Sequence, residues 1–198
     1  MRAGRRDGAN VACRGTSMSP TYEPGDRVVY ERVDGSEVRR GEVALFSAPE
    51  RYGFDAYLMH RVTGVGGDHV VCCTGQGRNA RITVNGKPLT EPYVNHGDAD
   101  GAHKAYDVTV PQGRLFLLGD NRGNARDSRF FADDHDGTVA VSAVRGRVTE
   151  DYTVPVLLGG AMIVGAVCVL VGLGLGIAAL AVRRRRTAAP VPPWPVQV

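Results

Sequence analysis

The feature that most constrains this chain is a long uncharged run near its C-terminus. From Tyr152 to Val182 there are 31 residues without Asp, Glu, Lys or Arg. As a helix, Val156–Val182 alone would be about 40 Å long, more than the roughly 30 Å of bilayer hydrocarbon. Four arginines follow directly, Arg183–Arg186, and such a cluster keeps its end of a membrane helix in the cytoplasm. We predict a transmembrane helix at 152–182 and a basic, Pro-rich cytoplasmic tail at 183–198.

The charge of the remaining chain is nearly balanced. The whole chain has 24 Lys and Arg against 21 Asp and Glu, a net charge of +3. Four of the positive charges are Arg183–Arg186, which leaves 20 against 21 elsewhere. A surface without excess positive charge has no electrostatic basis for attracting a polyanion. We therefore expect no nucleic-acid partner, and the lipid bilayer as one partner.

Before the uncharged run, short β-branched and aromatic segments alternate with Gly-rich turns, which predicts a mostly β fold. The expected strands are 27–33, 38–47, 57–63, 69–73, 80–84, 108–111, 115–118, 138–141 and 144–148. Asn85-Gly86 is a strong signal for a type I′ hairpin turn. The segment 49–57 is a polar, aromatic loop. The first 14 residues, 1–14, form a basic polar segment with no apolar run of signal-peptide length.

The cysteines show no metal-site pattern. They are Cys13, Cys72, Cys73 and Cys168. Adjacent side chains on a strand point to opposite faces, so we expect Cys72 and Cys73 to diverge. The loop 95–105 holds His96 and His103, and a metal site there is a minor alternative. We predict neither a metal nor a cofactor.

A first candidate for chemistry is the serine in Gly15-Thr16-Ser17-Met18-Ser19-Pro20-Thr21. Pro20 fixes its own φ and biases the residue before it towards an extended conformation. We expect a stiff, extended loop that presents the Ser17 hydroxyl in a set direction. To cleave a peptide, such a serine needs a base for its proton and donors for the oxyanion.

A second candidate is the histidine in a predicted strand, Tyr57-Leu58-Met59-His60-Arg61-Val62, which runs into a Gly-rich turn ending at Asp68. Imidazole has an ordinary pKa of about 6.5, which suits a base near neutral pH. The chain has only two lysines, Lys87 and Lys104. One lies beside a turn and the other in a loop, so neither is well placed as a buried amine base.

A third candidate follows the apolar segment 115–118. It reads Gly119-Asp120-Asn121-Arg122-Gly123-Asn124-Ala125-Arg126-Asp127-Ser128-Arg129. Charged residues in a loop are usually solvated, but here they come directly after a predicted buried strand. We name this segment the Gly119–Arg129 motif, and the segment Gly15–Thr21 the Ser17 loop.

Taken in order, these motifs resemble the conserved boxes of the type I signal peptidases, and the phrase around Asn85-Gly86 also looks like that family. The resemblance covers about residues 15–148. It implies a signal-peptidase-like antiparallel β-sheet catalytic domain at 15–151, with 69–110 as a less regular second lobe. It also implies Ser17 as nucleophile and His60 as general base. Most bacterial members have Lys at the latter position, whereas archaeal and endoplasmic-reticulum types have His.

The resemblance implies roles for three charged residues of the Gly119–Arg129 motif. A histidine base gains from a carboxylate that fixes its tautomer. Asp127 is the first candidate for that role and Asp120 the second. Arg129 is expected to pair with a nearby acid and to hold the motif in shape. Because an imidazole needs less desolvation than an amine to be neutral, we expect a wetter site than in the Lys enzymes.

The oxyanion site departs from the family. The backbone N–H of Ser17 is the expected first donor, and Gly119 helps to shape the site. Many members supply a second donor from a serine two residues before the nucleophile, where this chain has Gly15. Thr16 or a backbone group substitutes, or the oxyanion hole is weaker.

The resemblance implies a serine endopeptidase, anchored by one membrane span, that removes signal peptides from exported preproteins whose leaders end in Ala-x-Ala. The body of the chain, residues 1–150, would lie outside the plasma membrane, although residues 1–14 show no export signal. The alternative is a catalytically silent homologue that acts as a membrane-bound binding module. A self-cleaving repressor-type peptidase is disfavoured, because neither a DNA-binding helix pair nor a suitable lysine is visible.

Overall fold

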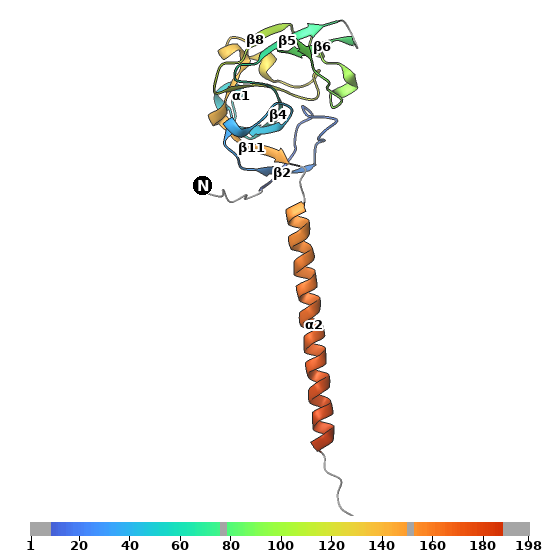
Figure 1. Cartoon of the computed structure of the whole chain (residues 1–198). Helices are drawn as coiled ribbons and strands as arrows, with labels where there is room; N and C mark the ends of the chain where they lie inside the picture. The colour runs from blue at the N-terminus through green and yellow to red at the C-terminus, as the bar shows by residue number, and fades with distance from the viewer. Residues whose placement is uncertain (1–8, 76–78, 150–152, 188–198) are drawn as a thin grey trace, which may run out of the picture. The chain divides into compact units, whose positions relative to one another are not determined.

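The computed structural model describes residues 9–75, 79–149 and 153–187. The chain divides into two compact units, one ending at Glu150 and the other beginning at Asp151. The first unit is built from β-strands and short helices, and the described part of the second is one helix (Figure 1). We describe each unit by itself.

The larger sheet of the first unit has seven strands. In spatial order they are β1 (Ala9–Ala12), β2 (Arg27–Glu31), β11 (Val144–Thr149), β3 (Val43–Phe46), β4 (Leu58–Val65), β9 (Arg114–Leu118) and β10 (Val139–Ala140). All neighbours pair antiparallel. The predicted mostly β, antiparallel fold is confirmed. Strand β1 lies within the segment expected to be only basic and polar, because its backbone completes the free edge of β2.

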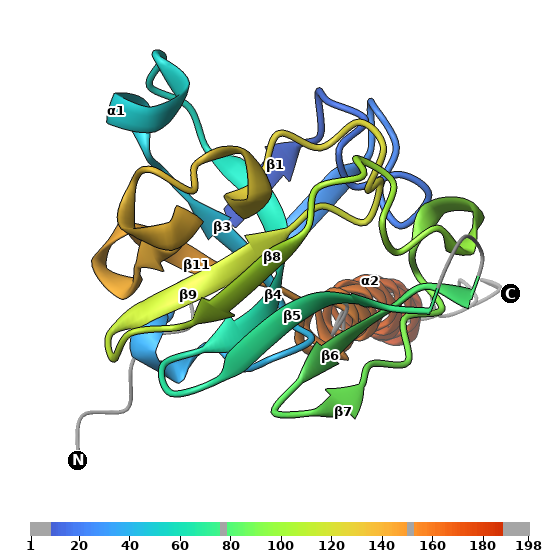
Figure 2. The same cartoon turned by 90° about the horizontal axis from the view of Figure 1, so that it is seen from above.

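A smaller sheet of four strands lies beside the first (Figure 2). Its order is β7 (Lys87–Pro88), β6 (Arg81–Val84), β5 (His69–Thr74) and β8 (Tyr106–Thr109), again antiparallel. Between β6 and β7, Asn85 and Gly86 have φ angles of 53° and 73°. Two positive φ angles are what a type I′ turn requires, so the sequence prediction of this hairpin is confirmed.

The remaining short elements correct two predicted boundaries. They are η1 (Gly35–Glu37), α1 (Pro49–Tyr52), η3 (Asn95–Gly97), η4 (Ser128–Phe130), η5 (His135–Gly137) and η6 (Val141–Ala143). The strand predicted from residue 38 begins only at Val43, because η1 and a turn precede it. Helix α1 forms within the segment predicted as a loop. Proline at its first position and left-handed Gly53 after its end favour this single turn.

Strand β9 lies between two hydrophobic clusters. Its residues Leu115 and Leu117 pack in a cluster with Phe46 and other side chains of the larger sheet. The alternate residues, Phe116 and Leu118, pack in a second cluster with side chains of the smaller sheet. Because successive side chains of a strand point to opposite faces, β9 is buried on both sides. The Gly119–Arg129 motif therefore follows a strand that is buried on both sides.

The prediction that Cys72 and Cys73 diverge is wrong. Their sulfur atoms are joined in a disulfide, and the peptide bond between them is cis. The covalent bond between the sulfurs holds both side chains on one side of the chain.

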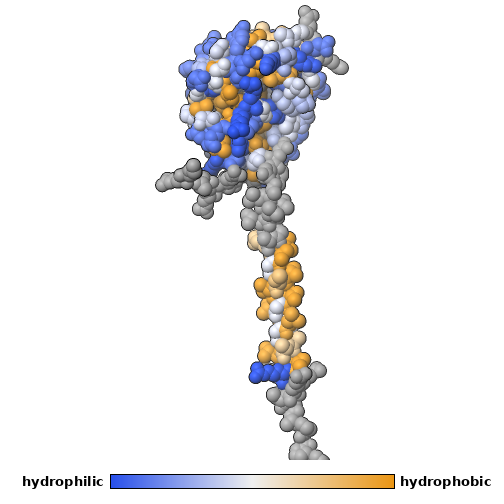
Figure 3. Space-filling model, in the orientation of Figure 1, coloured by the Kyte–Doolittle hydropathy of each residue, from blue (hydrophilic) through white to orange (hydrophobic). Residues whose placement is uncertain are grey.

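The second unit contains α2 (Thr153–Thr187). Its segment Met162–Arg183 has a mean hydropathy of 2.6 and exposed side chains. Figure 3 shows apolar side chains along this helix and a hydrophilic residue at the end of its coloured part. By length and composition, this helix could cross a membrane. The predicted tail beyond Thr187 lies outside the described residues.

Candidate active site

The Ser17 loop is a compact turn and not the extended segment that we expected. Ser19 N–H donates to Thr16 C=O at 3.2 Å, and Tyr22 N–H donates to Met18 C=O at 3.0 Å. Met18 is buried at 1% exposure, whereas Ser17 is only partly buried. The turn thus anchors the loop through its methionine and leaves the neighbouring serine accessible.

The Gly119–Arg129 motif holds the Ser17 loop through two asparagines. Asn121 N–H donates to Ser17 C=O at 3.0 Å, and Asn121 Nδ2 donates to Thr16 C=O at 3.2 Å. Asn124 Nδ2 donates to Thr16 Oγ1 at 2.5 Å. Residues more than one hundred positions apart are thereby fixed against each other.

This close approach needs glycine at position 119. A Cβ atom there would lie 2.5 Å from the carbonyl oxygen of Ser17 and would also collide with Cβ of Ala125. By contrast, a Cβ atom built on Gly15 meets nothing within 4 Å. Gly119 therefore shapes the site by its lack of a side chain, whereas the surroundings of Gly15 leave room for one.

Asp120 joins the second motif to the first and third. Its side chain is fully buried. Arg61, which follows His60 on β4, donates to it from Nε at 2.8 Å and from Nη2 at 2.5 Å. Thr21 Oγ1 of the Ser17 loop also donates to it, at 2.5 Å. This carboxylate ties together three segments that the sequence separates.

Asp127 and Arg129 form a buried ion pair. Arg129 donates to Asp127 from Nε at 2.8 Å and from Nη2 at 2.7 Å, and both side chains are at most 1% exposed. Asp127 also accepts from the backbone N–H of Gly119 at 3.0 Å. The expected acidic partner of Arg129 is thus Asp127. Together they fix the beginning of the Gly119–Arg129 motif.

His60 lies on β4 and is buried at 3% exposure. Its ring centroid is 5.6 Å from that of Phe46. Burial lowers the pKa of His60, the nearby Asp127 carboxylate opposes this shift, and Arg129 reinforces it. Phe46 and the surrounding strands therefore exclude water from the imidazole, and the comparison with the Lys enzymes stays a prediction.

Neither predicted carboxylate hydrogen-bonds to His60. The Nδ1 atom of His60 is buried and has no hydrogen-bond partner among the residues that the structure describes. Asp127 forms an ion pair with Arg129, and Asp120 forms one with Arg61. The two aspartates therefore influence His60 through their charge. Among the described residues, no hydrogen bond joins Ser17 to His60.

A cavity of about 660 Å³ opens beside Ser17. Leu58 and Met59, the two residues before His60, line it on β4, and the end of β1 lines it as well. His60 itself is not among the lining residues. The lining side chains are mainly apolar: Val11, Ala12, Cys13, Arg14, Gly15, Ser17, Met18, Val28, Leu45, Phe54, Ala56, Tyr57, Leu58 and Met59.

Comparison of the chain with known proteins identifies its family. The family model described as "Signal peptidase, peptidase S26" matches residues 8–153, a region that contains all three motifs. The chain belongs to the S26 family of signal peptidases.

Two curated relatives of this S26 chain are bacterial. A probable signal peptidase I of Mycobacterium leprae is 32% identical over 70% of this chain. A signal peptidase I of Bacillus caldolyticus is 31% identical over 73% of it. The chain spans 58% of the length of the first relative and 79% of the second.

Among solved structures, a signal peptidase I from Enterococcus faecalis aligns with 57% of this chain and 97% of its own. The identity is 24% and the TM-score 0.42.

Both lysines of this S26 chain lie away from the cavity. Lys87 is exposed in β7, and Lys104 is exposed with its Nζ 4.5 Å from the ring centroid of Phe130. Sequence reasoning missed the role of Arg61, Asn121 and Asn124 in fixing the site. Of these three residues, only Arg61 could have been singled out from the sequence, because alternation along a strand places its side chain on the face opposite His60.

Proposed function

We propose that this chain is a signal peptidase I-type serine endopeptidase, with Ser17 as nucleophile and His60 as general base. The observation that carries the proposal is the position of Ser17, which borders an apolar cavity and is held by the Gly119–Arg129 motif. Family membership supports the reaction class.

In this mechanism His60 accepts the Ser17 proton as the hydroxyl attacks the scissile carbonyl, and later donates it to the leaving amine. The lowered pKa of His60 favours the neutral form that a base requires. Catalytic hydrogen bonds are often long in unliganded enzymes and tighten with substrate. We place the Ser17–His60 contact in the substrate complex.

The oxyanion would be stabilised by the Ser17 N–H and by the Thr16 hydroxyl. Because Thr16 Oγ1 accepts a hydrogen bond from Asn124, its own proton is free for a further acceptor. Asp120 and Asp127 would act by holding the motif and by their charge near His60, and not as hydrogen-bonding partners of the imidazole.

The substrate would be the end of a preprotein leader, in the form Ala-x-Ala. An extended peptide can add to an exposed strand edge, with its side chains entering pockets on one face. Strand β1 is an edge strand, and its Val11 and Ala12 line the cavity together with Leu58 and Met59 of β4. This apolar lining suits small aliphatic side chains.

The apolar helix α2 would anchor the enzyme in the plasma membrane by a single span. The arginines after residue 182 would stay in the cytoplasm, which places the catalytic unit outside. Protease added to intact spheroplasts should digest the body under this arrangement, and protection until lysis would contradict it.

The decisive experiment incubates the full chain in detergent with a preprotein whose leader ends in Ala-x-Ala. We expect cleavage after the last Ala that is lost in Ser17→Ala and kept in the control Ser36→Ala, an exposed serine in η1. Binding of the preprotein without cleavage would contradict the enzyme and favour the silent binding module.

A further inference from the structure

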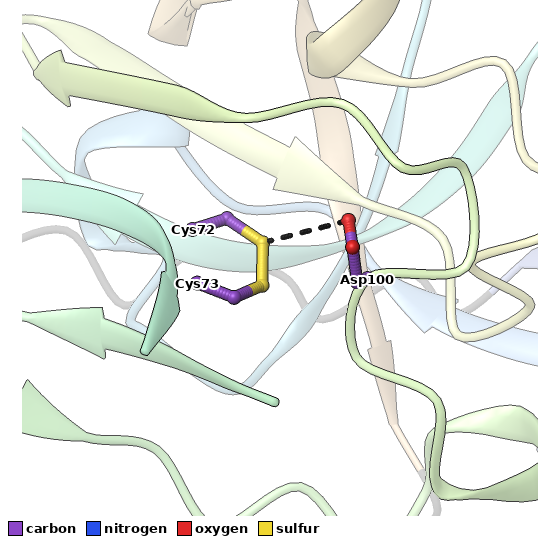
Figure 4. Close-up of side chains that lie close together, drawn as sticks. All are labelled: Cys72, Cys73 and Asp100. Atoms are coloured by element: carbon purple, nitrogen blue, oxygen red, sulfur yellow. Dashed lines mark hydrogen bonds between the residues drawn. A yellow bond between two sulfur atoms is a disulfide. The ribbon is translucent and has the colours of Figure 1, made fainter. Parts of the chain in front are cut away.

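A cluster of potential metal ligands lies on the smaller sheet, outside the proposed active site. Figure 4 shows the disulfide between Cys72 and Cys73 of β5 facing the carboxylate of Asp100. The two sulfurs and a carboxylate oxygen lie within 4.8 Å of one another. Cys72 Sγ is 4.0 Å from Asp100 Oδ1. Sequence spacing could not show this, because Asp100 comes from a separate loop.

A fourth potential ligand follows Asp100 in the loop. Nδ1 of His103 lies 3.2 Å from Oδ2 of Asp100, and its backbone N–H donates to Asp100 C=O at 2.8 Å. The imidazole is exposed, and a four-ligand site requires it to turn towards the sulfurs. Two thiolates, a carboxylate and an imidazole form a donor set that tetrahedral Zn²⁺ accepts.

The loop that carries Asp100 is fixed to the Gly119–Arg129 motif. Asn95 N–H donates to Asp120 C=O at 3.0 Å, and Arg122 Nη1 donates to Ala99 C=O at 3.3 Å. Arg122 is itself buried and paired with Glu91 at 2.6 Å. The carboxylate is therefore held opposite the sulfurs by contacts that do not depend on the disulfide.

We propose that Cys72, Cys73, Asp100 and His103 bind a zinc ion when the disulfide is reduced. The disulfide form cannot ligate, because metal binding requires thiolates. A dithiol reductant opens the site by thiol–disulfide exchange. It gives two electrons and two protons to the sulfurs and becomes a disulfide itself.

Zinc then replaces the two thiol protons, which pass to solvent. Two thiolates on one zinc ion lie about 3.8 Å apart, given Zn–S bonds of about 2.3 Å and tetrahedral angles. On the same ion, a thiolate sulfur and a carboxylate oxygen would lie about 3.5 Å apart, given a Zn–O bond of about 2.0 Å, which is close to the 4.0 Å between Cys72 Sγ and Asp100 Oδ1. Cys73 is only partly buried, which leaves a path for reductant and metal.

The test uses the full chain in detergent, reduced by a dithiol that is then removed anaerobically. Cadmium chloride is the probe, because Cd²⁺ bound to thiolates gives a charge-transfer absorption in the ultraviolet. We expect one Cd²⁺ per reduced chain, displaced by zinc, and no such band in the oxidised chain. The control Cys13→Ser removes a free cysteine elsewhere and should leave the band unchanged.

Two variants test the ligands without relying on one substitution. Cys72→Ser should abolish the band, and Asp100→Asn should weaken Cd²⁺ binding by more than about tenfold while both thiols remain. Metal should also raise the unfolding midpoint of the reduced wild type, since it binds only the folded site. A reduced wild type without the band, or a band unchanged in Cys72→Ser, would overturn the proposal. Unchanged affinity in Asp100→Asn would remove Asp100 from the site.

Discussion

The Gly119–Arg129 motif and the Ser17 loop are two halves of one site built in opposite ways. In the motif, Asp120, Asp127 and Arg129 are buried and paired. In the loop, the serine is only partly buried and hydrogen bonds from the motif hold its carbonyl group. The buried half provides rigidity, and the accessible half presents the reactive hydroxyl. Changes to the two halves should therefore separate stability from activity.

The largest effect should come from the reactive groups. We expect Ser17→Ala and His60→Ala each to lower kcat/KM by more than about 10⁴-fold, because nucleophile and base act as a unit. The Ser17→Ala variant should change the free energy of unfolding by less than about 1 kcal/mol, as for a surface substitution. Cleavage assays and thermal unfolding measure both. Normal cleavage by His60→Ala, with loss in Lys104→Ala, would contradict the proposed base.

Substitutions in the buried half should instead lower the stability of the fold. Arg129→Met leaves the Asp127 carboxylate buried without its partner and should cost about 3–5 kcal/mol of unfolding free energy. The matched control is Arg147→Met, which removes partly exposed pairs with Glu31 and Glu42 and should cost less than about 1 kcal/mol. Denaturant unfolding of the two variants compares them directly. Similar losses of unfolding free energy in both variants would show that burial does not make the Asp127–Arg129 pair more important for stability.

A gain of function should be available at the accessible half. The space around Gly15 admits a side chain, and Gly15→Ser would restore the hydroxyl that many family members have there. Since one oxyanion donor can be worth about 10²–10³ in rate, and Thr16 is proposed to supply part of it, we expect kcat/KM to rise about tenfold. Gly15→Ala is the control without the donor. Equal rates in both variants would argue that no donor is missing.

The smallest effect concerns pH. Because burial lowers the pKa of His60, the acid limb of kcat/KM should lie below the ordinary value of about 6.5. The unfolded chain binds this proton at higher pH than the folded one, so His60 should make stability fall as pH drops below about 6.5. Rate profiles and unfolding at several pH values, with Phe46→Ala as a more solvated comparison, measure this. An acid limb of kcat/KM with its midpoint above pH 7 would contradict a lowered pKa of His60.

The same enclosure of His60 determines what we expect of His60→Lys. A site open to water would leave a lysine charged and inactive near neutral pH. A buried site lowers the pKa of an amine, so this variant should retain more activity at neutral pH than His60→Ala. Activity equal to that of His60→Ala at neutral and alkaline pH would show that the enclosure does not accept an amine.

Features that depend on local pattern could be predicted from the sequence alone. The uncharged run predicted a helix of membrane-spanning length, and β-branched segments predicted most strands. Asn85-Gly86 predicted its turn, because type I′ geometry needs two positive φ angles that these residues tolerate. The order of the Ser17, His60 and Gly119–Arg129 motifs pointed to the family before any contact between them was visible.

How those residues contact one another depends on the packing of the folded chain. The pairing of Asp127 with Arg129 and of Asp120 with Arg61, the burial of His60 beneath Phe46, and the approach of Asp100 to the Cys72–Cys73 disulfide all follow from packing. A carboxylate takes the partner that best compensates its loss of water, and that choice depends on which strands enclose it. Spacing along the chain carries no record of such desolvation, which is why the sequence named the charged residues of the site without assigning their partners.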